Sequence, residues 1–121
     1  MKQCLIVDDS RVIRKVARKI LEGLNFDVDE AEDGAGALER CRAQMPDAVL
    51  LDRNLPNMVG PEFLRQLRRE VNGGKPVIVY CVIENDVARI TEAVNAGANE
   101  YLVKPFDRES VSSKFAQAGL I

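Results

Sequence analysis

The stretch Asp47-Ala48-Val49-Leu50-Leu51-Asp52 decides the fold class, because it is a compact apolar run that ends directly in a carboxylate. Its length and its polar flanks predict a buried strand. Similar apolar runs occur at residues 4–7, 76–82 and 101–103. Residues 26–31 predict a weaker strand, and their alternating acidic positions favour a place at the edge of a sheet.

Amphipathic segments separate these strands and predict five helices. The first starts at Arg11 and is closed by Gly23 and Asn25; the second carries Ala37, Leu38 and Cys41 and ends before Pro46; the third carries Phe63, Leu64, Leu67 and Val71; the fourth is capped by Asn85 or Asp86, carries Val87, Ile90, Ala93 and Val94, and ends at Gly97; the last is capped by Asp107 and carries Val111 and Phe115. Five strands, each followed by a helix, predict an α/β fold with a doubly wound parallel sheet.

Composition limits the possible functions. The chain has 121 residues, of which 46% are hydrophobic and 30% charged, which is typical of one globular domain. Its formal net charge of −2 gives no general attraction to nucleic acid. Apolar runs are too short to span a membrane, and acidic residues follow the first run too early for a signal peptide, so we expect a cytoplasmic protein.

The sequence contains no histidine and three isolated cysteines, Cys4, Cys41 and Cys81. This pattern excludes the usual zinc spacings and histidine-based catalysis, and it predicts buried free thiols. Arginines cluster at positions 11, 14 and 18 and again at 65, 68 and 69, where nearby glutamates favour solvated helix faces.

Charged residues follow three of the predicted strands. Asp8 and Asp9 follow the first, Asp52 ends the third, and Lys104 follows the fifth. Parallel strands place these ends at one edge of the sheet, where ligands of such folds bind. Clustered carboxylates need a compensating cation, and Mg²⁺ suits oxygen ligands. Asp52 stands alone and is the better nucleophile for phosphorus, whereas the adjacent Asp8 and Asp9 are better placed to hold the metal.

The motifs LIVDDS (5–10), LLDRNLPNMVG (50–60), ENDVA (84–88) and AGANEYLVKPF (96–106) resemble the receiver domains of bacterial response regulators, especially their CheY-like single-domain members. The resemblance implies a flavodoxin-like sheet with strand order 2-1-3-4-5. It also implies that residues 1–121 form a single receiver domain without an output domain.

The same resemblance implies a role for each matching residue. Asp52 corresponds to the phosphoacceptor, and Lys104 would contact the phosphoryl group. Asp9, Asp52 and the backbone carbonyl of Asn54 would hold Mg²⁺, with Asp8 acting directly or through water. The bond from Lys104 to Pro105 would be cis and would aim the lysine into the pocket.

The resemblance further implies protein partners. A histidine kinase or phosphotransfer protein would donate the phosphoryl group, and a downstream protein would bind the surface formed by helix four, strand five and helix five. Tyr101 corresponds to the aromatic switch residue of that surface; an ordinary packed strand residue is the alternative. No nucleic acid or membrane partner is expected.

Several residues depart from the family pattern. Val82 is expected at the position where the family has Ser or Thr, and valine has no donor for the phosphoryl group. Switching is therefore expected to be weakened or rerouted. Arg53, beside the acceptor, and Glu84 are expected to modulate the lifetime of the phosphorylated form; a solvated loop residue is the alternative for Arg53. Val59 and Ile83 predict exposed apolar surface near the pocket, which favours partner binding that depends little on phosphorylation.

Three alternatives to a phosphorylated signalling module remain. One is a degenerate receiver that binds partners without phosphorylation, which Val82 favours and the intact Asp9, Asp52 and Lys104 disfavour. The second is a Mg²⁺-dependent phosphatase with an aspartate nucleophile, which lacks the expected D-x-D arrangement. The third is a flavin carrier, for which no phosphate-binding loop follows the first strand. We therefore expect no enzymatic turnover beyond self-catalysed phosphorylation and dephosphorylation of Asp52.

Overall fold

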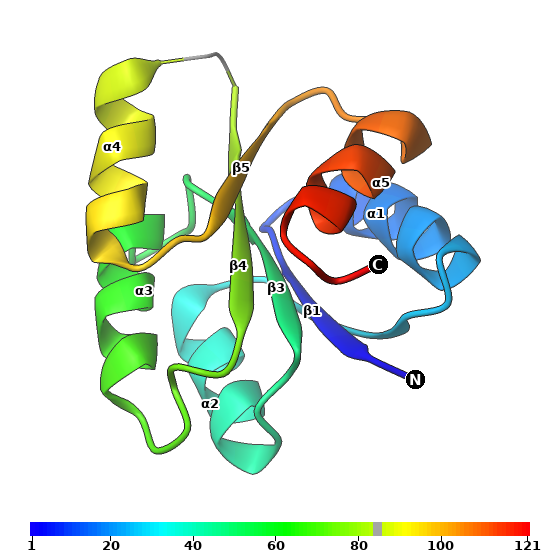
Figure 1. Cartoon of the computed structure of the whole chain (residues 1–121). Helices are drawn as coiled ribbons and strands as arrows, with labels where there is room; N and C mark the ends of the chain where they lie inside the picture. Colours follow the sequence, from blue (N-terminus) through cyan, green and yellow to red (C-terminus); the bar gives the residue numbers. More distant parts are fainter. Residues whose placement is uncertain (84–85) are drawn as a thin grey trace.

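Strands and helices alternate along the chain in the computed structural model, which describes residues 1–83 and 86–121 (Figure 1). The elements within these residues are β1 (Gln3–Val7), α1 (Arg11–Gly23), β2 (Asp27–Ala31), α2 (Gly34–Ala43), β3 (Ala48–Asp52), α3 (Gly60–Arg69), β4 (Val77–Val82), α4 (Val87–Ala96), β5 (Glu100–Val103) and α5 (Arg108–Gln117). Each predicted segment therefore corresponds to an observed element. In the described parts of the chain, no helix has the length and apolarity needed to cross a membrane.

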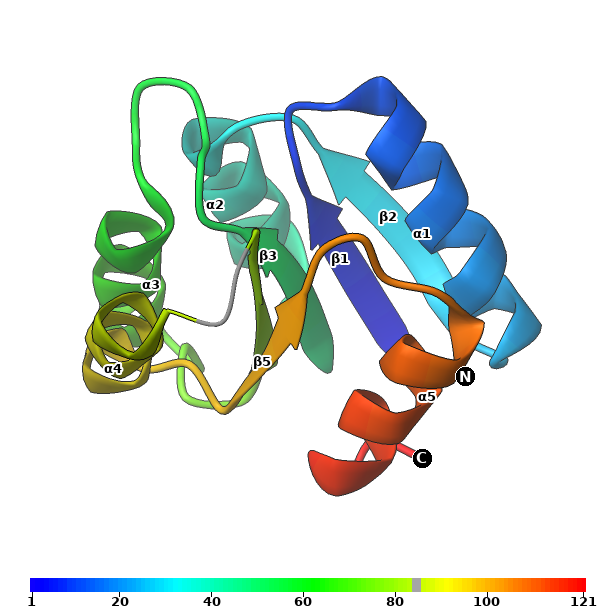
Figure 2. The ribbon, with the colours of Figure 1, turned by 90° about the horizontal axis from the view of Figure 1, so that it is seen from above.

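The strands form one parallel sheet in the order β2-β1-β3-β4-β5. This confirms the predicted doubly wound, flavodoxin-like topology and the edge position of β2. Viewed from above, α1 and α5 cover one face of the sheet, and α2, α3 and α4 cover the other (Figure 2). We call these the α1/α5 face and the α2–α4 face.

Successive strand residues point to opposite faces, so the core is divided into two apolar clusters. The cluster on the α2–α4 face includes Leu51, Tyr80 and Val82. The cluster on the α1/α5 face includes Leu50 and Cys81. This alternation determines which side chains at the strand ends can meet.

Helix α4 begins and ends where the sequence predicts. Asp86 is the N-cap, and its carboxylate accepts hydrogen bonds from two backbone amides, while Gly97 closes the helix with a left-handed φ of 118°. The alternative cap, Asn85, lies outside the described residues. The predicted apolar stripe is wrong at Val87 and Val94, which are exposed, because Ala93 and Ala96 form the buried side of the helix.

Two further expectations are corrected. Val71 was expected in the third helix, but α3 ends at Arg69 and Val71 is exposed. Arg68 was expected on a solvated face, yet it is partly buried and donates hydrogen bonds to backbone carbonyls of Gly73, Pro76 and Gly97. Gly73 and Pro76 lie in the turn before β4 and Gly97 lies in the turn before β5. Carbonyls in turns need donors from outside the sheet, which explains why a guanidinium lies there.

The first arginine cluster is also partly structural. The side chains of Arg14 and Arg18 both pair with Glu30 of β2, at 3.0 and 2.6 Å. They thereby connect α1 to the edge strand. Cys4, Cys41 and Cys81 are buried free thiols, as predicted.

Candidate functional site

Three side chains form a row across neighbouring strands at the carboxyl edge of the sheet. Val7 of β1 pairs with Leu51 of β3, so Asp8, which follows Val7, lies level with Asp52. Asp52 in turn pairs with Cys81 of β4. The alternation of the strands directs all three row members, Asp8, Asp52 and Cys81, to the α1/α5 face.

Lys104 joins this row from β5. Its Nζ donates a hydrogen bond to Oδ2 of Asp8 at 2.7 Å and lies 3.3 Å from Oδ1 of Asp52. All three side chains are largely buried, with Lys104 only 17% exposed. The peptide bond between Lys104 and Pro105 is cis, as predicted. The acidic and basic groups that the sequence placed at one edge therefore meet in one site.

Burial has the largest effect on the pKa of Asp52 and raises it. The charge of Lys104 lowers this pKa, but Asp8 and Asp9 oppose it, and the pKa remains above its ordinary value. Burial lowers the pKa of Lys104, yet the hydrogen bond to Asp8 and the charges of Asp52 and Asp8 outweigh it and raise the pKa overall. The site thus holds a protonated lysine and disfavours further negative charge unless another cation binds.

Asp9 completes an acidic cluster with Asp8 and Asp52. One carboxylate oxygen from each residue lies within 4.8 Å of the other two, and Asp9 is exposed while the others are buried. Carboxylate oxygens at this spacing, with one side open to water, fit a hard divalent cation that keeps part of its hydration shell. Asn54 follows Asp52 by two residues, is exposed, and accepts a side-chain hydrogen bond from Arg53.

Local hydrogen bonds fix Asp8 in place. Its Oδ1 accepts from the backbone amide of Ser10 at 2.9 Å, and its backbone carbonyl accepts from Arg14 Nη1 at 2.7 Å. Ser10 is also the N-cap of α1. The start of α1 therefore holds the Asp8 carboxylate toward Lys104.

A hollow of about 210 Å³ adjoins the Asp52 carboxylate on the β4 side. It is lined by Asp52, Arg53, Asn54, Cys81, Val82, Ile83 and Arg89. Asp52 therefore lies between the acidic cluster on one side and a hollow with two guanidinium groups on the other. A small molecule in this hollow would lie beside Asp52.

The sequence expectation for Val82 is corrected by the strand register. The side chain of Val82 belongs to the apolar cluster of the α2–α4 face, with Leu51 and Tyr80. The β4 side chain that lies level with Asp52 on its own face is Cys81. Sequence reasoning assigned Cys81 only to the core, because placing it in the site requires the register of β4 against β3.

Burial raises the pKa of the Cys81 thiol, and the charges of Lys104, Asp52 and Asp8 also act on it. These three groups are the members of the site described above. The thiol therefore lies within the electrostatic reach of the site.

Tyr101 is half-buried on β5 and packs against the cluster of the α2–α4 face. Lys114 of α5 lies with its Nζ 4.3 Å from the centre of the Tyr101 ring and pairs with Glu100 at 3.3 Å. Tyr101 thus contacts elements on both sides of β5. Near the site, Val59 and Ile83 are exposed, as expected, whereas Glu84 lies outside the described residues.

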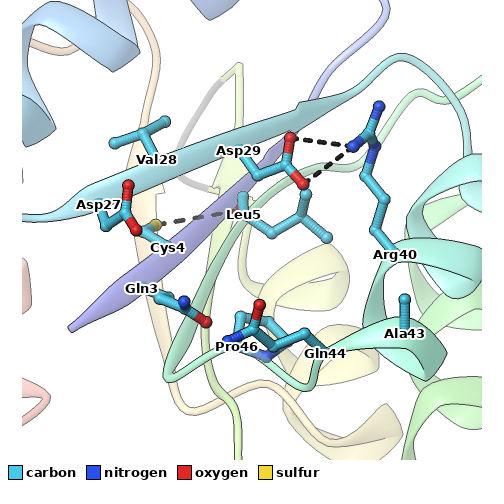
Figure 3. A pocket seen from close by; sticks show the side chains of 10 residues that line it. All are labelled: Gln3, Cys4, Leu5, Asp27, Val28, Asp29, Arg40, Ala43, Gln44 and Pro46. Carbon is cyan, nitrogen blue, oxygen red and sulfur yellow. Dashed lines mark hydrogen bonds and ion pairs between the residues drawn. The ribbon is translucent and has the colours of Figure 1, made fainter. Parts of the chain in front are cut away.

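A second hollow, of about 360 Å³, lies near the other end of the strands (Figure 3). Residues of β1, β2 and the end of α2 line it, and Arg40 of α2 pairs there with Asp29 of β2 at 2.9 Å (Figure 3). Gln3, Gln44 and Pro46 lie along its other side. It contains none of the residues of the acidic cluster.

Comparison with known proteins gives one consistent family. The family model of the response regulator receiver domain matches residues 4–116. The chemotaxis response regulator CheY4 of Vibrio cholerae superimposes with a TM-score of 0.93 at 30% identity and covers 98% of both chains. The receiver domain of the sensor histidine kinase PA1611 of Pseudomonas aeruginosa gives a TM-score of 0.87 at 28% identity, again over 98% of both chains. That structure has a magnesium ion coordinated in its active site cleft.

Curated relatives are longer than this chain. The protein-glutamate methylesterase/protein-glutamine glutaminase of Treponema pallidum is 39% identical over 110 residues, which are 88% of this chain and 27% of that protein. A response regulator at 36% identity matches over 91% of this chain and 47% of its own length. The chain thus spans less than half the length of these relatives.

Proposed function

This chain belongs to the response regulator receiver domain family, and on that premise we propose that it accepts a phosphoryl group on Asp52 and signals through protein contacts. The observation that carries this proposal is the position of Lys104, which bridges the buried carboxylates of Asp8 and Asp52. Such a lysine balances part of the acidic charge and lies where phosphoryl oxygens would gather. In this proposal the chain is a signalling module whose only reaction is the phosphorylation and dephosphorylation of its own Asp52.

The carboxylate of Asp52 has the properties of a phosphorus nucleophile. It is fixed at the end of β3, and the adjoining hollow opens one side of it to a reactant. In the proposed reaction, an Asp52 oxygen attacks the phosphorus of a phosphohistidine. An O–P bond forms, the N–P bond breaks, and the imidazole of the donor protein leaves and takes up a proton. Attack by water on the same phosphorus later releases inorganic phosphate and restores the carboxylate.

Lys104 would stabilise the transferred group. Its ammonium donates to Asp8 and lies near Asp52, so a small movement brings it to a phosphoryl oxygen. Charge stabilisation of this kind is the main contribution that a protein makes to phosphoryl transfer. Lys104 is therefore proposed as the phosphoryl contact on the β5 side.

The acidic cluster fits Mg²⁺ by its donor set. Asp9 and Asp52 would hold the ion together with the backbone carbonyl of Asn54, and Asp8 would bind directly or through water. When bound, the ion would neutralise negative charge on the phosphoryl oxygens. A bound cation would also offset the burial of the Asp52 carboxylate, which is the main cause that raises its pKa.

The proposed partners are proteins. A histidine kinase or phosphotransfer protein would present its phosphohistidine at the open edge of the sheet. A downstream protein would bind the surface of α4, β5 and α5, where Tyr101 and Lys114 are in contact. The exposed side chains of Val87 and Val94 add apolar area to this surface on α4.

Arg53 lines the hollow beside Asp52, and we propose that it shields the phosphorylated carboxylate from water.

Intact-mass measurement tests the acceptor chemistry. After incubation with phosphoramidate and Mg²⁺, the wild type should gain one phosphoryl group, and Asp52→Asn should gain none. Asp27→Asn is the matched control, because Asp27 is an exposed strand carboxylate far from the cluster, and it should behave like the wild type. A phosphoryl group that persists on Asp52→Asn, or its absence from the wild type, would refute the proposal.

A further inference from the structure

We propose that the outer edge of β2, together with the hollow beside it, binds an extended and basic segment of a partner protein. β2 is an edge strand of the sheet, and it pairs with β1 on one of its sides. The hollow of about 360 Å³ opens along this edge, between residues 27–29 of β2 and the last turn of α2 (Figure 3). This surface lies at the other end of the strands from Asp52, so it is separate from the phosphorylation site.

The backbone of β2 offers a donor on its outer side. The amide of Asp27 donates to the carbonyl of Lys2, the residue before β1. Backbone groups of a paired strand alternate between its two sides, so the amides of Val28 and Glu30 point outward. The Glu30 amide already donates to Oδ1 of Asp29 at 2.9 Å. The Val28 amide, which no described side chain caps, can therefore pair with an added strand.

Acidic side chains follow the same edge, and one of them has no cationic partner. On the α2–α4 face, Asp29 accepts hydrogen bonds from Nη1 of Arg40 at both carboxylate oxygens, at 3.0 and 2.9 Å. Glu30, on the opposite face, pairs with arginines of α1. Asp27 lies two residues before Asp29 and so on the same face. Within residues 1–83 and 86–121, however, Asp27 pairs with no lysine or arginine. A cationic side chain added at Asp27 would therefore repeat the contact that Arg40 makes with Asp29.

The lining of the hollow suits a long basic side chain. It contains two carboxylates, those of Asp27 and Asp29, and one guanidinium, that of Arg40. An acidic side chain would therefore meet an excess of negative charge there. Leu5 and Pro46, which are buried apolar residues, belong to the same lining. Apolar walls next to an exposed carboxylate fit the aliphatic stem and the charged head of lysine or arginine.

The charges also disfavour a second copy of the chain as the occupant of this edge. If two β2 strands paired, the carboxylates of Asp27, Asp29 and Glu30 would face those of the other copy. Like charges on opposed strand positions destabilise the pairing, and charged edge strands commonly prevent such association. A partner strand with lysine or arginine facing Asp27 avoids this repulsion. The edge of β2 therefore selects a partner segment of basic sequence.

An NMR titration of the full chain with a blocked peptide, Thr-Val-Arg-Val-Thr, tests the proposal. The arginine and the threonines share one side of the extended peptide, so the arginine can face Asp27 while the backbone pairs with β2. The Val28 amide resonance should shift and saturate, because it gains a hydrogen bond. Resonances of residues around the hollow should shift with it. A peptide with glutamate in place of arginine should bind more weakly.

Three substitutions give matched comparisons. Asp27→Asn removes the charge that faces the peptide and should weaken binding about two- to fivefold, which is the size of a partly exposed ion pair. Arg40→Gln releases the Asp29 carboxylate and should strengthen binding of the arginine peptide by a similar factor. Glu39→Gln removes an exposed charge of α2 outside the hollow and should leave the affinity close to that of the wild type. The same spectra show whether each variant is folded.

Several results would overturn the proposal. No binding of the arginine peptide at millimolar concentration, equal binding of the two peptides, or an unchanged affinity of Asp27→Asn would each refute the cationic site. Binding that leaves the Val28 amide unshifted would refute strand addition. A shift of the Val28 amide on dilution of the protein alone would mean that a second copy occupies the edge. None of these results bears on phosphorylation of Asp52, which is measured separately by mass.

Discussion

Replacing Lys104 by methionine should make the stability of the protein more dependent on Mg²⁺. Methionine keeps most of the aliphatic volume but removes the ammonium that contacts Asp8 at 2.7 Å and Asp52 at 3.3 Å. Without metal, the variant leaves two buried carboxylates and Asp9 with no compensating cation. With Mg²⁺, the same carboxylates bind the ion without competition from an ammonium group.

The expected size of the effect follows from burial. The side chains of Asp8 and Asp52 are 5% and 10% exposed, so the ion pair counts as buried. Removing one partner of a buried pair costs on the order of 3–5 kcal/mol. We expect the low end, about 3 kcal/mol, because Asp52 already has a raised pKa and can take up a proton when Lys104 is absent. If the loss of the ammonium group tightens Mg²⁺ binding tenfold, saturating Mg²⁺ restores about 1.4 kcal/mol of the lost free energy of unfolding.

Urea denaturation followed by circular dichroism, at neutral pH and low ionic strength, measures both values. The free energy of unfolding should fall by about 3 kcal/mol without Mg²⁺ and by about half as much at saturating Mg²⁺. Lys114→Met is the matched control, because Lys114 also pairs with a partly buried carboxylate, Glu100, but lies outside the cluster. Its effect should not depend on Mg²⁺. If Lys104→Met loses the same stability in both conditions, the carboxylates do not hold the metal in competition with Lys104.

Three other predictions concern the scaffold. Arg68→Ala should lower the free energy of unfolding by about 2–3 kcal/mol, because it removes the donor to carbonyls in the turns before β4 and before β5. Arg65→Ala, on the exposed side of the same helix, should change it by less than about 0.5 kcal/mol, and equal losses in urea denaturation would contradict the structural role. Tyr80→Phe should raise the thermal midpoint, since the buried Tyr80 hydroxyl has no hydrogen-bond partner among the described residues; a lower midpoint would mean that the hydroxyl is satisfied. Glu30→Gln should cost about 0.5–1 kcal/mol at neutral pH, because the hydrogen bond from Arg18 is the main cause that lowers the pKa of Glu30. A lowered folded-state pKa stabilises above the ordinary pKa of about 4.3 and is lost as the pH falls through the folded value, so the difference between wild type and variant in urea denaturation should close at acid pH.

Most of the fold was predictable because strands and helices differ in hydrophobic period. The apolar runs that end in Asp52 and Lys104 are short and continuous, as buried parallel strands require. The buried side of α4 was less predictable, because the helix packs through Ala93 and Ala96 rather than through its larger valines. Side-chain size alone does not reveal which face of a helix lies close to a neighbouring element.

The role of Arg68 could not be predicted for a different reason. Its hydrogen bonds go to carbonyls that lie 5, 8 and 29 positions away in the sequence, in two separate turns. A helical arginine among other charged residues gives no sign of such partners. Only the positions of the turns before β4 and before β5 distinguish Arg68 from the exposed Arg65 and Arg69.

The acidic cluster and Cys81 illustrate the limits of sequence reasoning within one site. Asp8, Asp52 and Lys104 could be placed together because each lies at or just beyond a strand end, where an error of one residue still leaves a charged group at the same edge. The choice between Cys81 and Val82 has no such tolerance, because a shift of one residue moves a side chain to the other face of the sheet. The pairing of Asp52 with Cys81 decides that choice.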